Sequence, residues 1–281
     1  MANTEISQES SLHLDQYFKT SDDQVPRILE AFLDGEIDPE TTATRTASIY
    51  APQLSQGNAS PTDELWTALV EVAKHSGRDQ ADASRAVTFL NSLSEQGDIA
   101  DAASVAIQPS WATGGVYWRD LPGFAFAFRV QAFDLDRHRF LRGKESLLQT
   151  TTFAATYLQY GNPTIRKGMI FLAEVGLMTG LEHDHGELND LYLPAAATWM
   201  AIAAERVREL CNENYNRDDD APGLPEVYHG PPLWSAGRGF SVGRWQFWKQ
   251  RFETLAQSNR LSDELRGQAR RAHDAMVRVD E

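Results

Sequence analysis

The chain has 281 residues, with 26 Lys and Arg against 40 Asp and Glu, which gives a formal net charge of −14 at pH 7. Its content of 42% apolar, 23% charged and 10% aromatic residues is that of a folded globular protein, and it excludes collagen-like, coiled-coil and disulfide-framework proteins. The acidic balance also argues against a nucleic-acid binder, because binding the phosphate backbone requires clustered Lys and Arg.

The single cysteine, Cys211, allows no disulfide within the chain, which indicates a reducing compartment. Because Cys211 falls in the apolar pattern of a helix, we expect a core residue rather than a nucleophile. The first residues lack the basic region and apolar run of a secretory signal. No uncharged apolar run reaches the ~18 residues of a membrane span. We therefore expect a cytoplasmic protein that does not interact with membranes.

Helical periodicity dominates the chain after residues 1–10, which we expect to be frayed. A helix is predicted to begin at Ser60 and Pro61, because a hydroxyl cap followed by Pro at the first helical position is a typical helix start. Its apolar stripe comprises Leu65, Trp66, Leu69, Val70 and Ala73. The next predicted helix has a similar stripe, formed by Ala83, Ala86, Val87, Leu90 and Leu93.

The longest helical candidate covers residues 188–214, and Pro194 is expected to mark its true start. Two further helices are predicted near the C-terminus, each capped by a serine. The stripe after Ser241 comprises Trp245, Trp248, Phe252 and Leu255. The stripe after Ser262 comprises Leu265, Ala269, Ala272, Met276 and Val279.

Two loops rich in Trp, Gly and Pro interrupt this pattern, at residues 109–122 and 214–238. We expect residues 214–227 to be a flexible acidic loop. The apolar segments at 115–118 and 228–234 do not alternate for long enough to form strands. The sequence therefore predicts an all-α fold, with residues 1–281 forming a single compact domain of about nine to eleven helices.

The densest group of titratable residues is His183-Asp184-His185-Gly186-Glu187. Two His and a carboxylate are possible ligands of zinc or iron. We interpret the group instead as the C-terminal end of a helix. Gly186 would end the helix, and a His side chain near a helix C-terminus interacts favourably with the helix dipole. The Asp218–Asp220 run lacks the spacing of a calcium loop and is interpreted as a solvated linker. Dinucleotide, P-loop and GxSxG motifs are absent, so we expect neither a metal nor a cofactor.

Aromatic residues flank both loops or open the helix that follows them: Trp118, Trp234, Trp245 and Trp248. Such side chains can wall a pocket for a flat ligand, or they can anchor the loops on the core. The polar groups nearest to them in sequence are Asp120, Arg129, His229 and Arg244. These residues fit either catalysis or structural ion pairs and loop hydrogen bonds.

Several segments resemble the fungal family of unknown function called DUF3632. They are Pro194-Ala195-Ala196 with Trp199, Gly230-Pro231-Pro232-Leu233-Trp234, Gly239-Phe240-Ser241 and the run Arg244-Trp245-Gln246-Phe247-Trp248-Lys249-Gln250-Arg251-Phe252. The segments Trp118-Arg119-Asp120-Leu121-Pro122-Gly123-Phe124 and Leu181-Glu182 are also similar to the family pattern. The resemblance covers roughly residues 12–279, and the GPPLW and RWQFWKQRF segments are its specific parts.

The sequence departs from this pattern in two places. The first Gly of the family's GGPLW-like loop aligns with His229 or is displaced by the extra Pro232. Residues Leu148–Phe153 lack the Trp and Asn that the family shows in one helix. These changes indicate a specialised member. The resemblance implies a helical, soluble protein of a filamentous fungus, from a family in which some members lie among natural-product biosynthetic genes.

From this resemblance we expect a cofactor-independent cyclase or isomerase that acts on an aromatic polyketide or prenylated phenol, for example by adding a phenol hydroxyl to an alkene. Such a reaction needs a general acid, a base and a dry aromatic pocket. The candidate acids and bases are Asp120, His229, Glu182 and His183. The candidates for holding a phenolate or ketone oxygen are Arg129 and Arg244. The candidate pocket walls are Trp118, Phe124, Trp234 and Trp245.

The alternative is a non-catalytic binding or scaffold protein, in which the Trp-rich segments form part of the core and a groove for a partner. The two hypotheses make different demands on the aromatic residues. An enzyme needs a closed cavity with ionisable groups pointing inward. A scaffold needs packed Trp side chains and an exposed apolar surface.

Overall fold

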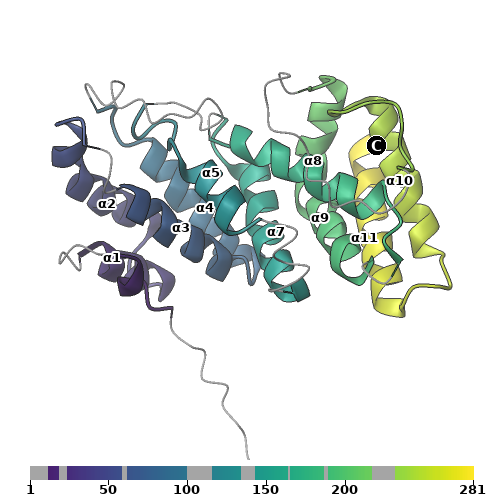
Figure 1. The fold of residues 1–281 in the computed structure, drawn as a ribbon, viewed down its shortest axis with the longest axis horizontal. Coiled ribbons are helices and arrows are strands. Elements are labelled where there is room, and N and C mark those ends of the chain that lie inside the picture. The colour runs from purple at the N-terminus through teal and green to yellow at the C-terminus, as the bar shows by residue number, and fades with distance from the viewer. Residues whose placement is uncertain are drawn as a thin grey trace, which may run out of the picture.

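The computed structural model describes residues 12–18, 24–58, 62–99, 116–133, 143–163, 165–186, 189–216 and 232–281. Within these ranges the chain forms ten α-helices and one 3-10 turn, η1 (Asp15–Tyr17), and no strand (Figure 1). The prediction of an all-α fold of about nine to eleven helices is confirmed. The expectations for residues 1–10 and for most of 214–227 lie outside the described residues.

The helices follow one another as five pairs stacked along the long axis of the molecule (Figure 1). The pairs are α1 (Gln24–Leu33) and α2 (Pro39–Leu54), α3 (Thr62–Ser76) and α4 (Gln80–Ser94), α5 (Phe124–Gln131) and α7 (Gly143–Tyr160), α8 (Lys167–Leu181) and α9 (Asn189–Asn212), and α10 (Val242–Ala256) and α11 (Asp263–Asp280).

The stack has two layers. Helices α2, α4, α7, α9 and α11 pack in sequence as one layer, and α1, α3, α5, α8 and α10 pack in sequence as the other. The short α5 contacts α7 through aromatic rings, with Phe128 and Phe153 centroids 5.2 Å apart. Each pair therefore packs mainly against its neighbours, which is the arrangement of repeat-like helical stacks. The first and last pairs form the two ends.

Local chemistry explains where four of these helices begin. The carboxylates of Asp38 and Asp79 cap α2 and α4, and the predicted caps Ser241 and Ser262 accept hydrogen bonds from the N–H groups of Arg244 and Leu265. Each cap supplies an acceptor to a backbone donor that the first helical turn leaves unpaired. The predicted C-terminal helices are thus confirmed together with their starts.

Two predicted boundaries are wrong. Helix α9 begins at Asn189, so that Pro194 lies inside it rather than at its start. An interior Pro removes one backbone donor, and here the helix continues through it because the surrounding residues are buried against α7 and α8. Helix α8 ends at Leu181, before the His183–Glu187 group, and Gly186 occupies a left-handed turn with φ +58° that follows the helix.

A continuous apolar core runs through all five pairs, from Leu14 to Met276 among the described residues. The predicted stripes point into it, and only Val279 remains partly exposed. Cys211 is fully buried, and burial raises the pKa of its thiol to about 12, so the thiolate is scarce at neutral pH. The prediction that Cys211 is a core residue is confirmed. None of the described helices combines the length and apolarity needed to cross a membrane.

Helices α8 and α9 approach each other closely because two glycines face α9. A Cβ atom on Gly176 would lie 2.5 Å from the Trp199 indole nitrogen. A Cβ atom on Gly180 would lie 2.6 Å from the Ala196 Cβ and 2.8 Å from the Tyr192 carbonyl oxygen. These glycines therefore fix the spacing of the two helices, and with it the position of the residues at the end of α8.

We predict that Gly180→Ala destabilises the protein by about 1–3 kcal/mol, because the added methyl group meets backbone that cannot move freely. The control is Gly267→Ala in α11, where the new Cβ would meet only the flexible end of Arg271 at 3.5 Å. That change should stabilise the helix by up to ~1 kcal/mol. Urea unfolding of both variants measures the difference. Equal free energies of unfolding would contradict the close-packing argument.

Candidate functional site

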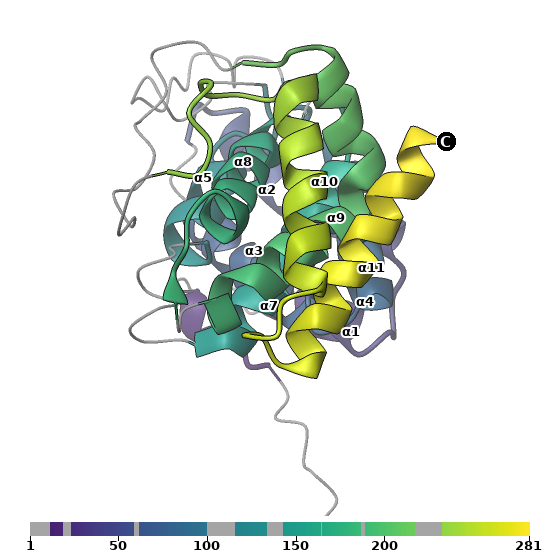
Figure 2. The same ribbon diagram turned by 90° about the vertical axis from the view of Figure 1, so that its right-hand side faces the viewer.

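Three of the segments that carry the family resemblance meet at the end of α8: Leu181-Glu182, Gly239-Phe240-Ser241 and the run from Arg244 to Phe252. The Leu233 N–H donates to the Glu182 carbonyl oxygen at 2.8 Å, and the Gly239 N–H donates to Glu174 Oε1 at 2.8 Å. These bonds hold residues 232–241 across α8 and the start of α10 (Figure 2). Residues far apart in the chain, from α8, this segment and α10, thereby form one site.

A buried arginine forms the centre of the site. Arg244 lies on the first turn of α10 and is 2% exposed. Its Nε donates to Glu182 Oε1 at 2.6 Å, and its Nη2 donates to Glu182 Oε2 at 2.9 Å. Its Nη1 donates to Glu174 Oε1 at 3.2 Å and also to the Gly239 carbonyl oxygen. The guanidinium fork therefore engages one carboxylate at two points and a second carboxylate at one.

Neutral donors complete the network. The Trp248 indole N–H donates to Glu182 Oε1 at 2.7 Å, and the Arg244 guanidinium carbon lies 5.3 Å from the centroid of a Trp248 ring. Two buried carboxylates face one guanidinium, so the N–H groups of Trp248 and Gly239 help to offset the excess negative charge. Burial alone would lower the pKa of Arg244. The hydrogen bonds and charges of Glu182 and Glu174 outweigh burial and raise it, so Arg244 stays charged.

The structure thus brings two predicted catalytic residues, Glu182 and Arg244, into direct contact. Both oxygens of Glu182 accept hydrogen bonds within the protein, and all three guanidinium nitrogens of Arg244 donate within it. In this geometry the pair positions α8, α10 and the segment between them. Its predicted roles in acid–base chemistry and in holding an oxygen of a substrate stay predictions.

Two histidines lie beside this network. His183 is 6% exposed, and burial, together with the charge of His185, lowers its pKa. His185 Nε2 lies 2.7 Å from the Thr179 carbonyl oxygen, and its ring centroid lies 4.8 Å from that of Tyr192. His183 is therefore held uncharged at neutral pH, in the state that can accept a proton. The described residues hold no group of three or more His, Cys, Asp and Glu arranged to hold a metal ion.

An apolar surface borders the network, and we call it the lip. It comprises Leu233, Trp234, Val242 and Phe247. Leu233 is 46% exposed and Val242 is 42% exposed. The Trp234 ring packs 5.4 Å from Phe247, and its indole N–H donates to the Gly237 carbonyl oxygen at 3.0 Å. The lip thus presents large apolar side chains to solvent on a backbone that is fixed by hydrogen bonds.

The remaining candidate wall residues pack inside the protein. Trp118 and Phe124 are each 1% exposed and lie in an aromatic cluster with Trp66 of α3, whose ring centroid is 6.4 Å and 6.1 Å from theirs. Trp245 is fully buried, and its indole N–H donates to Asp280 of α11 at 3.1 Å. The predicted walls therefore belong to different helix pairs, and only Trp234 reaches the surface.

The other predicted polar residues are also engaged. Asp120 accepts a hydrogen bond from the Val116 N–H at 2.7 Å, which closes a backbone turn. The Arg129 guanidinium lies 4.6 Å from the centroid of the Phe171 ring. His229 lies outside the described residues, as do Asp218–Asp220 and Glu187. The structure gathers Glu182, His183, Arg244 and Trp234 at one site and places Asp120, Arg129, Trp118 and Phe124 around α5.

Sequence reasoning missed Glu174, the second carboxylate of the network. The residue is 4% exposed and lies in α8, every residue of which is buried from Met169 to Leu181. A single charge within such an apolar run is a usable signal, because a charged side chain is almost never fully buried without a partner. The sequence could not identify that partner as Arg244, which lies 70 residues further along the chain.

Comparisons with known proteins add one finding. Residues 66–252 match the model of a family described as "Protein of unknown function (DUF3632)". The matched region contains α8, α9 and most of α10, and therefore all of the buried network. Neither a curated protein nor a solved structure matches the chain.

We predict that Glu182→Gln lowers the free energy of unfolding by about 3–5 kcal/mol, because it leaves Arg244 buried without its main counter-charge. Lys144→Met is the matched control, since it removes an exposed ion pair with Glu264 at 3.3 Å. That variant should lose less than ~1 kcal/mol. Urea titrations measure both values. A Glu182→Gln variant as stable as the control would show that the network does not hold the site together.

The lowered pKa of His183 predicts a specific loss of stability in acid. The His183 imidazole has its ordinary pKa of 6.5 in the unfolded chain and a lower pKa in the folded protein. As the pH falls below 6.5, the unfolded chain therefore binds a proton at His183 more readily than the folded protein does. Stability is therefore lost as the pH falls from 6.5 to the pKa of folded His183, and the loss then levels off. The urea midpoint should fall more between pH 7.5 and 5 for the wild type than for His183→Gln. Parallel declines would contradict the argument.

Proposed function

Because the chain belongs to the DUF3632 family, a family of unknown function, we propose that it is a non-catalytic helical scaffold that binds an apolar segment of another protein at the lip. The observation that carries this proposal is the exposure of Leu233 and Val242 beside Trp234, on a backbone tied to the buried Glu182–Arg244 pair. Exposed apolar groups on a fixed backbone are suited to binding, because little order has to be gained when the partner arrives.

The architecture supports the same proposal. Stacked helical pairs form an extended surface without needing an enclosed cavity, and such stacks commonly serve as binding surfaces. The void bounded by α3, α4 and α7 is lined by apolar residues such as Leu69, Phe89 and Phe153, and it has no space for a water molecule. The interior in this region is therefore filled by side chains. A filled interior suits a scaffold, which needs no enclosed cavity for a substrate.

The chemistry of the lip identifies the kind of partner. Trp234 offers a large aromatic face that is half-buried against Phe247 and Gly243. Leu233, which precedes it in the chain, and Val242, which precedes Gly243, add exposed aliphatic groups. Burying one such side chain fully contributes roughly 1.5–3 kcal/mol. Trp side chains are enriched among the residues that dominate binding energy. A short apolar segment of a polypeptide matches this surface.

The cyclase or isomerase hypothesis stays a prediction. Its candidate groups Asp120, Glu182 and Arg244 make internal contacts that need no substrate, which favours the scaffold over the enzyme. Cytoplasmic location in a filamentous fungus belongs to the same proposal. The single buried Cys211, which suits a reducing compartment, supports the location.

We predict that a photo-crosslinking residue in place of Leu233 captures partner proteins that the same residue in place of Val130 does not. Val130 is the matched control because it is 43% exposed on α5, away from the lip. With the captured partner purified, Leu233→Asp/Val242→Asp should raise the Kd at least ~10-fold. Val130→Asp should leave the Kd unchanged. Identical captures at both positions, or an unchanged Kd for the lip variant, would overturn the proposal.

A further inference from the structure

The charges of this protein are segregated along the stack. Residues 242–280, which form α10, α11 and the turn between them, carry eight Lys and Arg and five Asp and Glu, a net charge of +3. The other 242 residues together carry a net charge of −17, which with the +3 of this pair gives the total of −14. The last helix pair is thus a basic end on an otherwise acidic protein.

Four arginines of this basic end are exposed, and we call them the arginine face: Arg260, Arg270, Arg271 and Arg278. Their side chains make no ion pair or hydrogen bond with any residue that the structure describes. Three of the other four cations of this pair are engaged in close contacts, and the fourth, Arg251, is half-buried and interacts electrostatically with Asp184. Arg244 binds Glu182, Lys249 binds Asp280, and Arg266 binds Asp263. The side chains of the arginine face are therefore without close partners among the described residues, and only the charge of Arg260 acts on a described acid, by helping to lower the pKa of Asp184.

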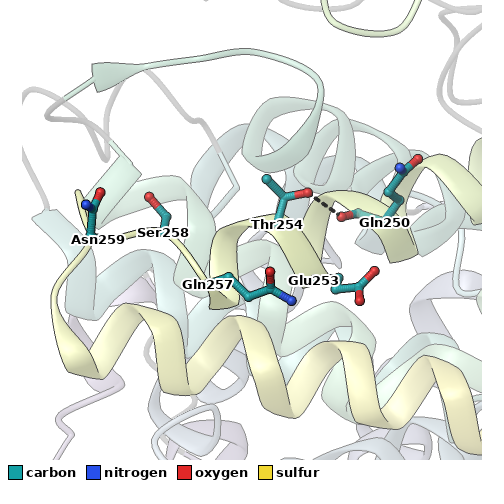
Figure 3. Close-up of a pocket in the computed structure, with 6 residues that line it drawn as sticks. All are labelled: Gln250, Glu253, Thr254, Gln257, Ser258 and Asn259. Atoms are coloured by element: carbon teal, nitrogen blue, oxygen red, sulfur yellow. Dashed lines mark hydrogen bonds between the residues drawn. The ribbon is translucent and has the colours of Figure 1, made fainter.

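A surface hollow of about 630 Å³ lies at the same end, on the C-terminal half of α10 and the turn that follows it (Figure 3). It is lined by Gln250, Glu253, Thr254, Gln257, Ser258 and Asn259. Five of these six side chains are neutral and can donate hydrogen bonds to carboxylates, and Glu253 is the only acid. Arg260 follows directly in the chain. The hollow and the arginine face together suit a partner that carries several carboxylates.

The opposite end of the stack carries such a group. Residues 34–38 connect α1 to α2, and with Pro39 and Glu40 at the start of α2 they contain four acids and no base; we call residues 34–40 the acidic turn. Asp34, Glu36, Asp38 and Glu40 are all exposed. Asp38 also caps α2, which fixes the shape of the turn. The neighbouring Arg85 donates to the Phe32 carbonyl oxygen and lies 3.6 Å from Asp82, so its single charge is shared with Asp82 and leaves the turn with an excess of negative charge.

We propose that the protein assembles head to tail, with the acidic turn of one copy docked on the arginine face and hollow of the next. The two surfaces lie at opposite ends of the stack (Figure 1), so the contact is heterologous, and it extends into a chain of copies unless the geometry closes a ring. The partner is a second copy because the same molecule supplies both surfaces. A nucleic acid fits less well, since the net charge of −14 repels phosphates.

Salt dependence follows from this arrangement. The electrostatic screening length is about 10 Å at 0.1 M salt and about 3 Å at 1 M. At 0.1 M the general repulsion between acidic copies is already confined to short range, while groups in contact still attract. At 1 M the attraction between the turn and the arginine face is screened as well. The assembly does not involve the lip and stands whether or not the lip binds another protein.

The test is sedimentation of the purified full chain at 0.1 M and 1 M NaCl. At 0.1 M the weight-average mass should exceed 31.4 kDa and rise with protein concentration, and at 1 M it should return to 31.4 kDa. The two single-end variants, Arg270→Glu/Arg271→Glu and Asp34→Lys/Glu36→Lys, should each stay monomeric at 0.1 M. Their equimolar mixture should associate again, because each reversed end then meets an opposite charge.

Two controls separate this outcome from others. Arg78→Glu/Arg238→Glu changes the net charge by the same amount as the arginine-face variant, using exposed arginines elsewhere, and it should still associate. Leu233→Asp should also associate, since it alters only the lip. A protein that stays at 31.4 kDa at every concentration overturns the proposal. So does association that survives either end variant, that the mixture fails to restore, or that is lost only in Leu233→Asp.

Discussion

The buried pair of Glu182 and Arg244 is the interaction on which the site depends. It joins the end of α8 to the first turn of α10, across 62 residues of chain, with the guanidinium bound at two points. Removing two charges from water is costly, and close contact repays the cost only when the remaining donors and acceptors are also satisfied. Glu174, Trp248 and Gly239 complete these contacts, so the whole network forms together.

The network also determines what the protein exposes. The backbone carbonyl of Glu182 holds Leu233, while its side chain holds Arg244 and Trp248. The same residue therefore fixes both the interior contact and the segment that carries the lip. The close approach of α8 and α9 at Gly176 and Gly180 fixes the distance between the two helices, and with it the position of Glu182 at the end of α8. A change in the Glu182–Arg244 pair is thus expected to alter the lip as well, because the Glu182 carbonyl oxygen accepts the hydrogen bond from Leu233.

The stacked architecture places the acidic turn far from the other two surfaces. The lip lies at the start of α10, in the same helix pair that carries the arginine face, whereas the acidic turn lies at the opposite end of the stack (Figure 1). Residues with catalytic chemistry have been absorbed into contacts within this stack, as Asp120 and Arg244 show. What remains available at the surface is apolar area and segregated charge. Both are properties of a protein that associates with other chains.

The sequence by itself determined the helices, their apolar faces and the interior position of Cys211. Those features follow from local rules: a stripe at helical spacing, a serine before it, or a lone thiol in an apolar run. Ser241 and Ser262 could be recognised as caps because a cap bonds to backbone only three residues ahead. Family-specific segments were recognisable for the same reason, since each is continuous in the chain.

Only the tertiary structure decided which residues meet. Glu182 and Arg244 are both visible in the sequence as possible site residues, yet nothing local indicates that they bind each other or that Glu174 joins them. Trp118 and Trp234 both stand beside Gly- and Pro-rich loops, but one is buried among rings and the other lies at the surface. The start of α9 before Pro194 belongs to the same class, because packing against neighbouring helices outweighed the local preference. Contacts between residues far apart in the chain decide which side chains meet, which Trp is buried and where α9 begins. The spacing of apolar residues along one helix carries no information about such contacts.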